Sequence, residues 1–140
     1  MNVNEIDNMY KKILIHNLDA VFASRYLKNS KSYDDTLVTF IGNKIFTFIG
    51  NYFYSLGISD ILYTFVIAKT KIVKKINIKN NDFRFCVELP IKLKRSKAKL
   101  GEINSTEKPR LAGKKKVNAL KDGFLILTEL IRLFFNKKEN

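Results

Sequence analysis

The chain has 140 residues, of which 46% are hydrophobic and 12% aromatic, and its formal net charge is +13. This composition excludes a disordered tail and supplies enough apolar side chains for one domain with its own core. The positive charge predicts an anionic binding partner, which could be nucleic acid, anionic lipid or a phosphorylated substrate. Because the chain is rich in Lys, Asn and Ile and has no Trp, compositional drift accounts for part of the excess lysine.

Cysteine and histidine are too scarce for several classes of site. Cys86 is the only cysteine, so no internal disulfide is possible, and its apolar neighbours predict a small buried side chain. With His16 as the only histidine, a zinc site or a Cys–His nucleophile is poorly supported. The polar start carries no secretory leader, which predicts a cytoplasmic protein. The longest uncharged run, Ile45 to Ser59, is shorter than the roughly 20 residues of a membrane span.

The first half of the chain alternates between helical and extended patterns. Residues 4–16 have apolar side chains at helical spacing, and residues 19–24 form a short apolar run typical of a buried strand. A polar loop over residues 25–35 follows. Residues 36–56 predict a helix with a broad apolar face. The sequence FIGN occurs twice in this helix, and its glycines either weaken the helix or permit close packing.

The middle of the chain continues the alternation. Residues 56–60 predict a turn, residues 61–68 a β-branched and aromatic strand, and residues 69–76 a short basic helix. After a loop, the chain is expected to be extended and then to become helical near Glu88, which we expect to be structural. Pro90 then falls in the first turn of that helix, where it is tolerated.

The last part of the chain combines a basic loop with an amphipathic helix. Residues 100–107 predict a turn and a short strand, and the loop EKPRLAGKKK (residues 107–116) follows. The helix after it places one apolar face at Leu120, Phe124, Leu127, Ile131 and Phe134. That face either contacts a membrane surface or packs on the domain or a partner. Alternating helices and short strands indicate one α/β domain.

Four stretches in this order resemble the second half of family 2 glycosyltransferases, especially dolichyl- and polyprenyl-phosphate sugar synthases. They are DAVFASRY (residues 19–26), GISD (residues 57–60), FRFCVELPIKLKRSKAKLGEI (residues 83–103) and RLAGKKKVNALKDG (residues 110–123). The resemblance spans nearly the whole chain. It implies a partial GT-A fold, in which helices flank a mixed sheet and an amphipathic helix ends the chain.

The family's first half, which binds the sugar nucleotide, has no counterpart in residues 1–140, which we interpret as a single domain. The resemblance implies Mg²⁺ or Mn²⁺ in the complete enzyme, with ligands outside this chain. Asp34 and Asp35 are adjacent rather than spaced like the family's Asp-x-Asp, so we interpret them as a solvated pair. The expected activity is hexosyl transfer from a nucleotide-sugar to a polyprenyl-phosphate or glycan acceptor, at the inner face of the membrane.

The resemblance also assigns the site. Asp60 is the catalytic carboxylate, acting as a general base toward a hydroxyl acceptor or as an orienting group toward a lipid phosphate. The alternative for Asp60 is an ordinary turn aspartate. A solvated charge run is the alternative for the basic loop, and Lys115 is expected to be solvated. The residues expected to bind a donor or acceptor phosphate are Ser24, Arg25, Arg110, Gly113, Lys114 and Lys116.

Two other functions compete with sugar transfer. A basic nucleic-acid-binding domain accounts for the charge, although no zinc finger, RNP aromatic motif or P-loop is present. A non-catalytic remnant or subunit accounts for the missing donor half. If half of a GT-A fold is missing, an open sheet edge and uncovered helices predict instability, oligomerisation or a partner chain.

Overall fold

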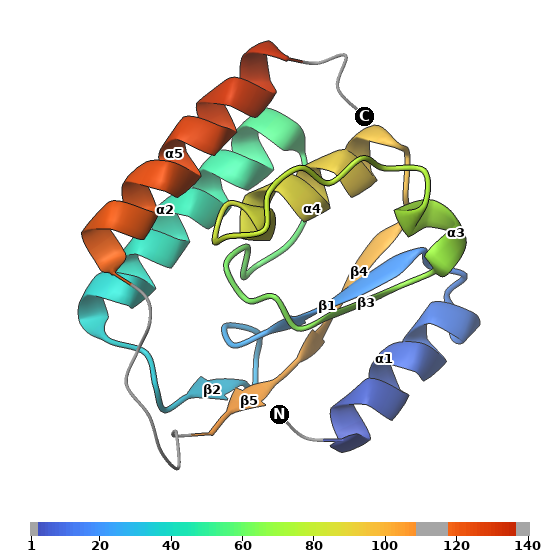
Figure 1. Ribbon diagram of the computed structural model, residues 1–140. Coiled ribbons are helices and arrows are strands. Elements are labelled where there is room, and N and C mark those ends of the chain that lie inside the picture. The colour runs from blue at the N-terminus through green and yellow to red at the C-terminus, as the bar shows by residue number, and fades with distance from the viewer. Residues whose placement is uncertain (1–2, 109–117, 137–140) are drawn as a thin grey trace.

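The computed structural model describes residues 3–108 and 118–136 as a mixed α/β fold, in which helices flank a small mixed sheet and a helix ends the chain (Figure 1). This confirms the α/β part of the prediction, with helices around a mixed sheet and a helix at the end of the chain. The helices are α1 (Val3–Ile15), α2 (Leu37–Tyr54), α3 (Thr70–Val73), α4 (Phe85–Arg95) and α5 (Ala119–Phe135). The strands are β1 (Ala20–Ser24), β2 (Lys31–Ser32), β3 (Val66–Ala68), β4 (Leu100–Asn104) and β5 (Thr106–Glu107). None of the described helices is long and apolar enough to cross a membrane.

The main sheet has β1 at its centre, in the order β3-β1-β4. Strand β1 runs antiparallel to β3 and parallel to β4, with Ser24 opposite Asn104 at the carboxyl ends of the parallel pair. Beyond that end, the short strands β2 and β5 form a second parallel pair that begins with Lys31 opposite Thr106. The carboxyl edge of β1 and β4 is therefore continuous with β2 and β5.

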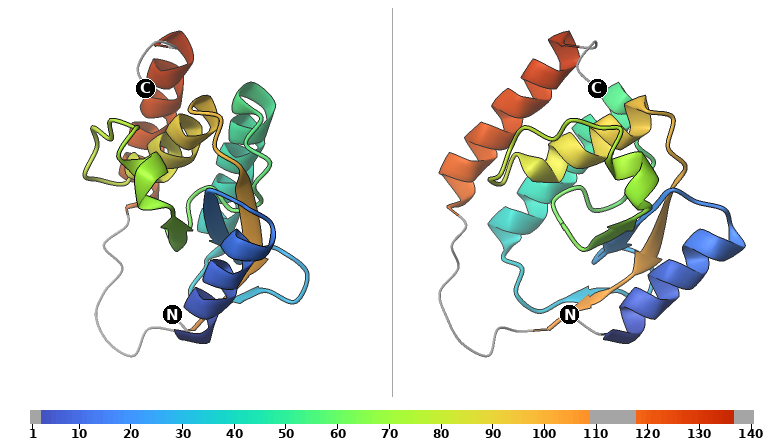
Figure 2. Two further views of the ribbon diagram at one scale, coloured as in Figure 1. Left: turned by 90° about the vertical axis from the view of Figure 1, so that its right-hand side faces the viewer. Right: turned by 45° about the vertical axis from the view of Figure 1, so that its right-hand side comes forward.

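The side chains of β1 alternate between two apolar layers, as the pleat of a strand requires. Val21 and Ala23 pack with Met9 and Ile13 of α1 on one face. Ala20 and Phe22 belong to the larger cluster on the other face, which includes residues of α4 and α5. Figure 2 shows α1 on one side of the sheet and α2, α4 and α5 on the other. Because both faces are covered, β1 is apolar from Ala20 to Ala23.

The predicted helices over residues 4–16 and 36–56 are confirmed, as is the final amphipathic helix. The helix predicted over residues 69–76 is shorter, because only Thr70–Val73 is helical. The strand predicted over residues 61–68 is shorter, because only Val66–Ala68 pairs with β1. The preceding residues leave the sheet: Ile61 is buried in the larger cluster, and its backbone N–H donates to Thr47 of α2.

Two further boundaries differ from the prediction. Helix α4 begins at Phe85 rather than near Glu88, because the backbone N–H of Phe85 donates to the Asp82 carbonyl and starts the first turn early. Pro90 therefore lies in the second turn and not in the first. The strand β2 falls inside the segment predicted as a polar loop, because its partner β5 is distant in sequence.

A polar stripe on the inner side of α2 holds the segment that carries Asp60. Asn51, Thr47 and Asn43 follow one another at intervals of four residues, and each donates to or accepts from that segment. The Asn51 side chain bonds both Gly57 and Ile58. Gly50 lets this segment approach closely, because an added Cβ would lie 2.7 Å from Cδ1 of Ile61. The FIGN glycine at position 50 thus permits close packing, whereas Gly42 faces open space.

Candidate functional site

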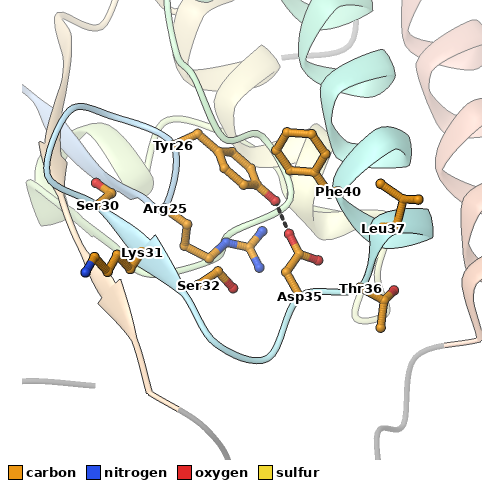
Figure 3. Close-up of a pocket in the computed structure, with 9 residues that line it drawn as sticks. All are labelled: Arg25, Tyr26, Ser30, Lys31, Ser32, Asp35, Thr36, Leu37 and Phe40. Carbon is orange, nitrogen blue, oxygen red and sulfur yellow. Dashed lines mark hydrogen bonds between the residues drawn. The ribbon is translucent and has the colours of Figure 1, made fainter.

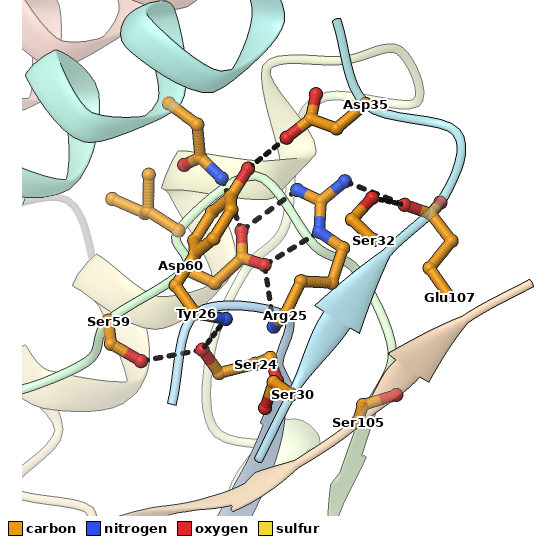
Figure 4. A network of polar contacts seen from close by, with 12 residues as sticks. Ser24, Arg25, Tyr26, Ser30, Ser32, Asp35, Ser59, Asp60, Ser105 and Glu107 are labelled. Carbon is orange, nitrogen blue, oxygen red and sulfur yellow. Dashed lines mark hydrogen bonds and ion pairs between the residues drawn. The ribbon is translucent and has the colours of Figure 1, made fainter. Parts of the chain in front are cut away.

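Polar side chains gather where β1 ends, at the carboxyl edge of the parallel strands (Figure 4). Ser24 is the last residue of β1, and Arg25 follows it directly. Asp60 arrives from the segment after α2, and Glu107 from β5. In α/β proteins this edge of a sheet is the usual place for ligands, because the loops after parallel strands leave a crevice there.

Asp60 holds Arg25 through a two-point ion pair. Its carboxylate accepts from Nε of Arg25 at 2.7 Å and from Nη2 at 3.0 Å, and it also accepts from the Arg25 backbone N–H at 3.1 Å. Nδ2 of Asn43 donates to the same carboxylate. Asp60 is 0% exposed, so its oxygens are saturated by protein donors and do not face solvent.

The Arg25 guanidinium is fixed on every side. Its carbon lies 4.7 Å from the ring centre of Tyr63 and 5.3 Å from that of Tyr26, and Nη1 donates to Glu107 at 3.2 Å. Burial alone lowers the pKa of Arg25, but the hydrogen bonds and charge of Asp60 outweigh it and raise the pKa. The side chain retains 12% exposure, so a permanent cation is held in one orientation with a small exposed surface.

Ser24 stabilises the site through hydrogen bonds to the residues beside Arg25 and Asp60. Its hydroxyl donates to Ser59 at 2.6 Å, and Ser59 donates to Glu102 of β4 through both its hydroxyl and its backbone N–H. The backbone N–H of Tyr26 donates to the Ser24 hydroxyl. Burial raises the pKa of Glu102. Ser24 is fully buried, so it ties the Asp60 segment to the sheet.

A pocket of about 410 Å³ lies over Arg25 (Figure 3). Lys31 and the hydroxyls of Ser30, Ser32 and Thr36 line it, while Tyr26 and Phe40 form an aromatic side. Asp35 also lines it, and it accepts a hydrogen bond from the Tyr26 hydroxyl, whose pKa burial raises. In Figure 3 the Arg25 guanidinium points into the space between Ser32 and Asp35. The pocket thus combines two cations, one carboxylate, several hydroxyls and an aromatic surface.

The structure brings together three of the predicted site residues, Ser24, Arg25 and Asp60. The other four, Arg110, Gly113, Lys114 and Lys116, lie outside the described residues. Sequence reasoning missed several contributors, which are Lys31, Asn43, Tyr63 and Glu107. Only Asn43 had a usable signal, because it shares a helix face with Thr47 and Asn51, where a polar face is unexpected.

Within residues 3–108 and 118–136, no group of three or more His, Cys, Asp or Glu side chains is placed to hold a metal ion. Asp35 bonds Tyr26 and Thr39, so it is not the solvated residue that was predicted. Glu88 is structural, as predicted: its carboxylate accepts from the backbone N–H groups of Lys79 and Asn80 and pairs with Lys92 at 2.8 Å.

No protein-family model matches the chain, and no curated protein matches it. A guanidinium offers a planar fork of donors that suits phosphate oxygens, and a lysine adds a mobile point charge. A pre-oriented Arg25 with Lys31 and hydroxyls beside it favours a phosphate group as the ligand.

Proposed function

We propose that this chain supplies the acceptor side of a family 2 glycosyltransferase with a GT-A fold. In this proposal a sugar passes from a nucleotide-sugar to a polyprenyl phosphate, and Arg25 contacts a phosphate group of the acceptor or donor. The observation that carries the proposal is the buried pair of Arg25 and Asp60 beside the pocket. The motifs ASRY and GISD, which carry the resemblance, contribute these two residues from positions 35 apart.

The reaction explains why a fixed cation is useful. An oxygen of the lipid phosphate attacks the anomeric carbon, the bond from that carbon to the nucleoside diphosphate breaks, and the diphosphate leaves with the electron pair. Negative charge moves between phosphate groups throughout, so a cation held in place beforehand stabilises the transition state most. By the resemblance, Mg²⁺ or Mn²⁺ adds to this stabilisation through ligands outside this chain.

Asp60 takes a positioning role in this proposal. Its carboxylate is buried and already accepts four hydrogen bonds, so it orients Arg25 rather than removing a proton. A lipid phosphate needs no general base, because its second pKa is about 6 and the attacking oxygen is largely ionised near neutral pH. A phosphate acceptor therefore suits the site better than a glycan hydroxyl.

The role of the basic loop remains a prediction, and it is supported by the position of Glu107, the described residue at which this loop begins. Glu107 of β5 bonds Arg25 at 3.2 Å and Ser32 at 2.5 Å, and the loop follows directly after it. Arg110, Gly113, Lys114 and Lys116 therefore belong to a segment that starts beside the pocket. They are proposed to add phosphate contacts to those of Arg25.

Binding of farnesyl phosphate, compared with farnesol, tests the proposal on the full chain. We expect the phosphate to bind at least about tenfold more tightly than the alcohol, and Arg25→Lys to remove most of that difference. Arg110→Ala should weaken binding much more than Lys115→Ala. Equal binding of the two ligands, or unchanged binding by Arg25→Lys, would contradict the proposal.

A second assay measures sugar transfer to the lipid phosphate. The chain is incubated with labelled nucleotide-sugars, farnesyl phosphate and Mg²⁺ or Mn²⁺, and lipid-linked label is measured. Transfer, alone or after addition of a chain that carries the donor half, supports the proposal. Nucleic-acid affinity that falls steeply with salt, without farnesyl phosphate binding, would favour the nucleic-acid hypothesis instead.

A further inference from the structure

Helix α2 is inverted relative to an ordinary surface helix. Its buried residues are small or polar: Asn43, Thr47 and Gly50. Most of its large apolar side chains face outward, namely Leu37, Val38, Ile41, Ile45, Phe48, Tyr52 and Phe53, whereas Phe46, Ile49 and Tyr54 pack against the core. A helix that is apolar on its outer side is normally covered by another apolar surface. The broad apolar face predicted for this segment therefore points away from the core.

Helix α5 shows a similar arrangement next to it. The apolar stripe predicted from its sequence, Leu120, Phe124, Leu127, Ile131 and Phe134, is exposed. The residues that pack on the domain are instead Ile126, Leu130 and Leu133. The two helices run side by side in Figure 1, and Phe53 of α2 contacts Phe134 of α5. Both therefore expose large apolar side chains in addition to those that hold them in place.

A chain of aromatic rings joins the two exposed stripes. Ring centres lie 5.9 Å apart between Phe48 and Tyr52, 4.9 Å between Tyr52 and Phe53, and 5.5 Å between Phe53 and Phe134. Phe135 extends the chain, 5.5 Å from Phe134. These rings are all exposed. We call this surface, formed by the exposed apolar side chains of α2 and α5, the outer apolar face.

The charges on the two helices favour one kind of partner. Helix α2 contains no acidic residue. The acids of α5 are engaged, since Glu129 is buried against Arg132 and Asp122 accepts from the Asn118 backbone N–H. Lys44 and Lys121 are exposed within one turn of Phe48 and Phe124. A second copy would bring another chain with a formal net charge of +13, whereas an anionic lipid surface complements the charge of this one.

The geometry points to the outer apolar face as a docking surface for an anionic membrane, on which α2 and α5 lie flat at the interface. Aromatic side chains suit the boundary between head groups and acyl chains, and nearby lysines add attraction to anionic lipid. Leu37 and Phe40 line the pocket over Arg25 and are also exposed at the start of α2. Docking would therefore place that pocket beside the lipid head groups.

Vesicle flotation tests this inference without any sugar or polyprenyl ligand, so its outcome is independent of the proposed activity. The full chain is mixed with phosphatidylcholine vesicles, with or without phosphatidylglycerol. The test variant is Phe48→Ser with Tyr52→Ser, whose side chains are 67% and 71% exposed. The matched control is Leu14→Ser with Ile15→Ser on α1, at 61% and 76% exposure. Thermal unfolding establishes that both variants fold.

We expect binding to the vesicles that contain phosphatidylglycerol and weaker binding to phosphatidylcholine alone. The α2 variant should lose at least about tenfold in partitioning, because it lacks two exposed rings that would be buried against the lipid, while the α1 variant should partition like the natural chain. No binding by the natural chain, or equal loss in both variants, would overturn the inference. A dimer in solution that only the α2 variant disrupts, without vesicle binding, would overturn it in favour of self-association.

Discussion

Two acidic residues of this protein, Glu88 and Asp60, are completely buried against a cation, yet their surroundings differ. Glu88 and Lys92 lie four residues apart in α4, and both side chains are 0% exposed. The Lys92 ammonium also donates to the Asn77 carbonyl. Asp60 reaches Arg25 across 35 residues, and Arg25 keeps an exposed edge at a pocket. One pair is closed to solvent and the other is open on its cationic side.

The difference separates a structural pair from a candidate binding group. Glu88 and Lys92 have partners in α4 and in the loop before it, so the pair fixes that loop on the helix. Arg25 joins the end of β1, the Asp60 segment and β5, and aromatic rings flank it. A buried ion pair is by itself weak evidence of function. Arg25 is distinguished from Lys92 because its guanidinium is held in one orientation and a ligand can still reach it.

The largest expected effect is on the closed pair. Glu88→Ala should lower the free energy of unfolding by about 3–5 kcal/mol, because it leaves Lys92 buried without its counter-charge. Urea denaturation measures this change. Glu107→Ala, at the edge of the open site, serves as the control and should cost about 1 kcal/mol or less. A loss for Glu88→Ala no greater than that of the control would show that the closed pair is not needed for folding.

Amide substitutions compare the two pairs at constant side-chain shape. Asp60→Asn and Glu88→Gln should each cost about 1.5–3 kcal/mol, because hydrogen bonds to a charged group are replaced by neutral ones. Only Asp60→Asn should also lower the affinity for farnesyl phosphate, by about tenfold, because Arg25 loses its orientation. Calorimetric titration of the folded variants measures this affinity. A comparable loss in Glu88→Gln would remove the distinction between the pairs.

The closed pair also predicts how stability depends on pH. Burial alone raises the pKa of Glu88, but the bond to Lys92 and the amides of Lys79 and Asn80 lower it overall. Because the pKa of Glu88 is lowered in the folded state, the ionised carboxylate stabilises the protein at pH values above the ordinary pKa of 4.5. This stabilisation is lost as the pH falls through the pKa of the folded state. Unfolding free energy should therefore fall below pH 4.5, by at most about 1.4 kcal/mol per pH unit for this group. Glu88→Gln should flatten the slope; an unchanged slope would assign it to other acids.

The smallest effects concern the packing that carries Asp60. An alanine at Gly50 would place its Cβ 2.7 Å from Ile61 and 3.0 Å from Leu56, whereas one at Gly42 meets nothing within 4 Å. Gly42→Ala should stabilise the protein by up to about 1 kcal/mol through helix propensity. Gly50→Ala should be destabilising by about 1 kcal/mol, because overpacking outweighs that gain. Thermal unfolding of the two variants decides whether α2 approaches the Asp60 segment this closely.

Local patterns predicted most of the helices, since α1, α2 and α5 have strong helical periodicity. The buried strand β1 was equally visible as an apolar run. Nothing local could show that β2 pairs with β5, because that contact is set by chain topology. Periodicity shows how wide an apolar face is but not what covers it. It therefore could not predict that the apolar stripes of α2 and α5 point away from the core. The meeting of Arg25 and Asp60 was suggested only by the family resemblance.

We propose that Asp60 orients Arg25 toward a phosphate ligand. An NMR titration that follows the side-chain signals of the arginines measures this contact directly. Farnesyl phosphate is added to isotope-labelled protein, with farnesol as the neutral control. We expect the guanidinium signals of Arg25 to shift with the phosphate and not with the alcohol, while those of Arg84 stay in place. Unmoved Arg25 signals while the ligand binds, or equal shifts with farnesol, would contradict it.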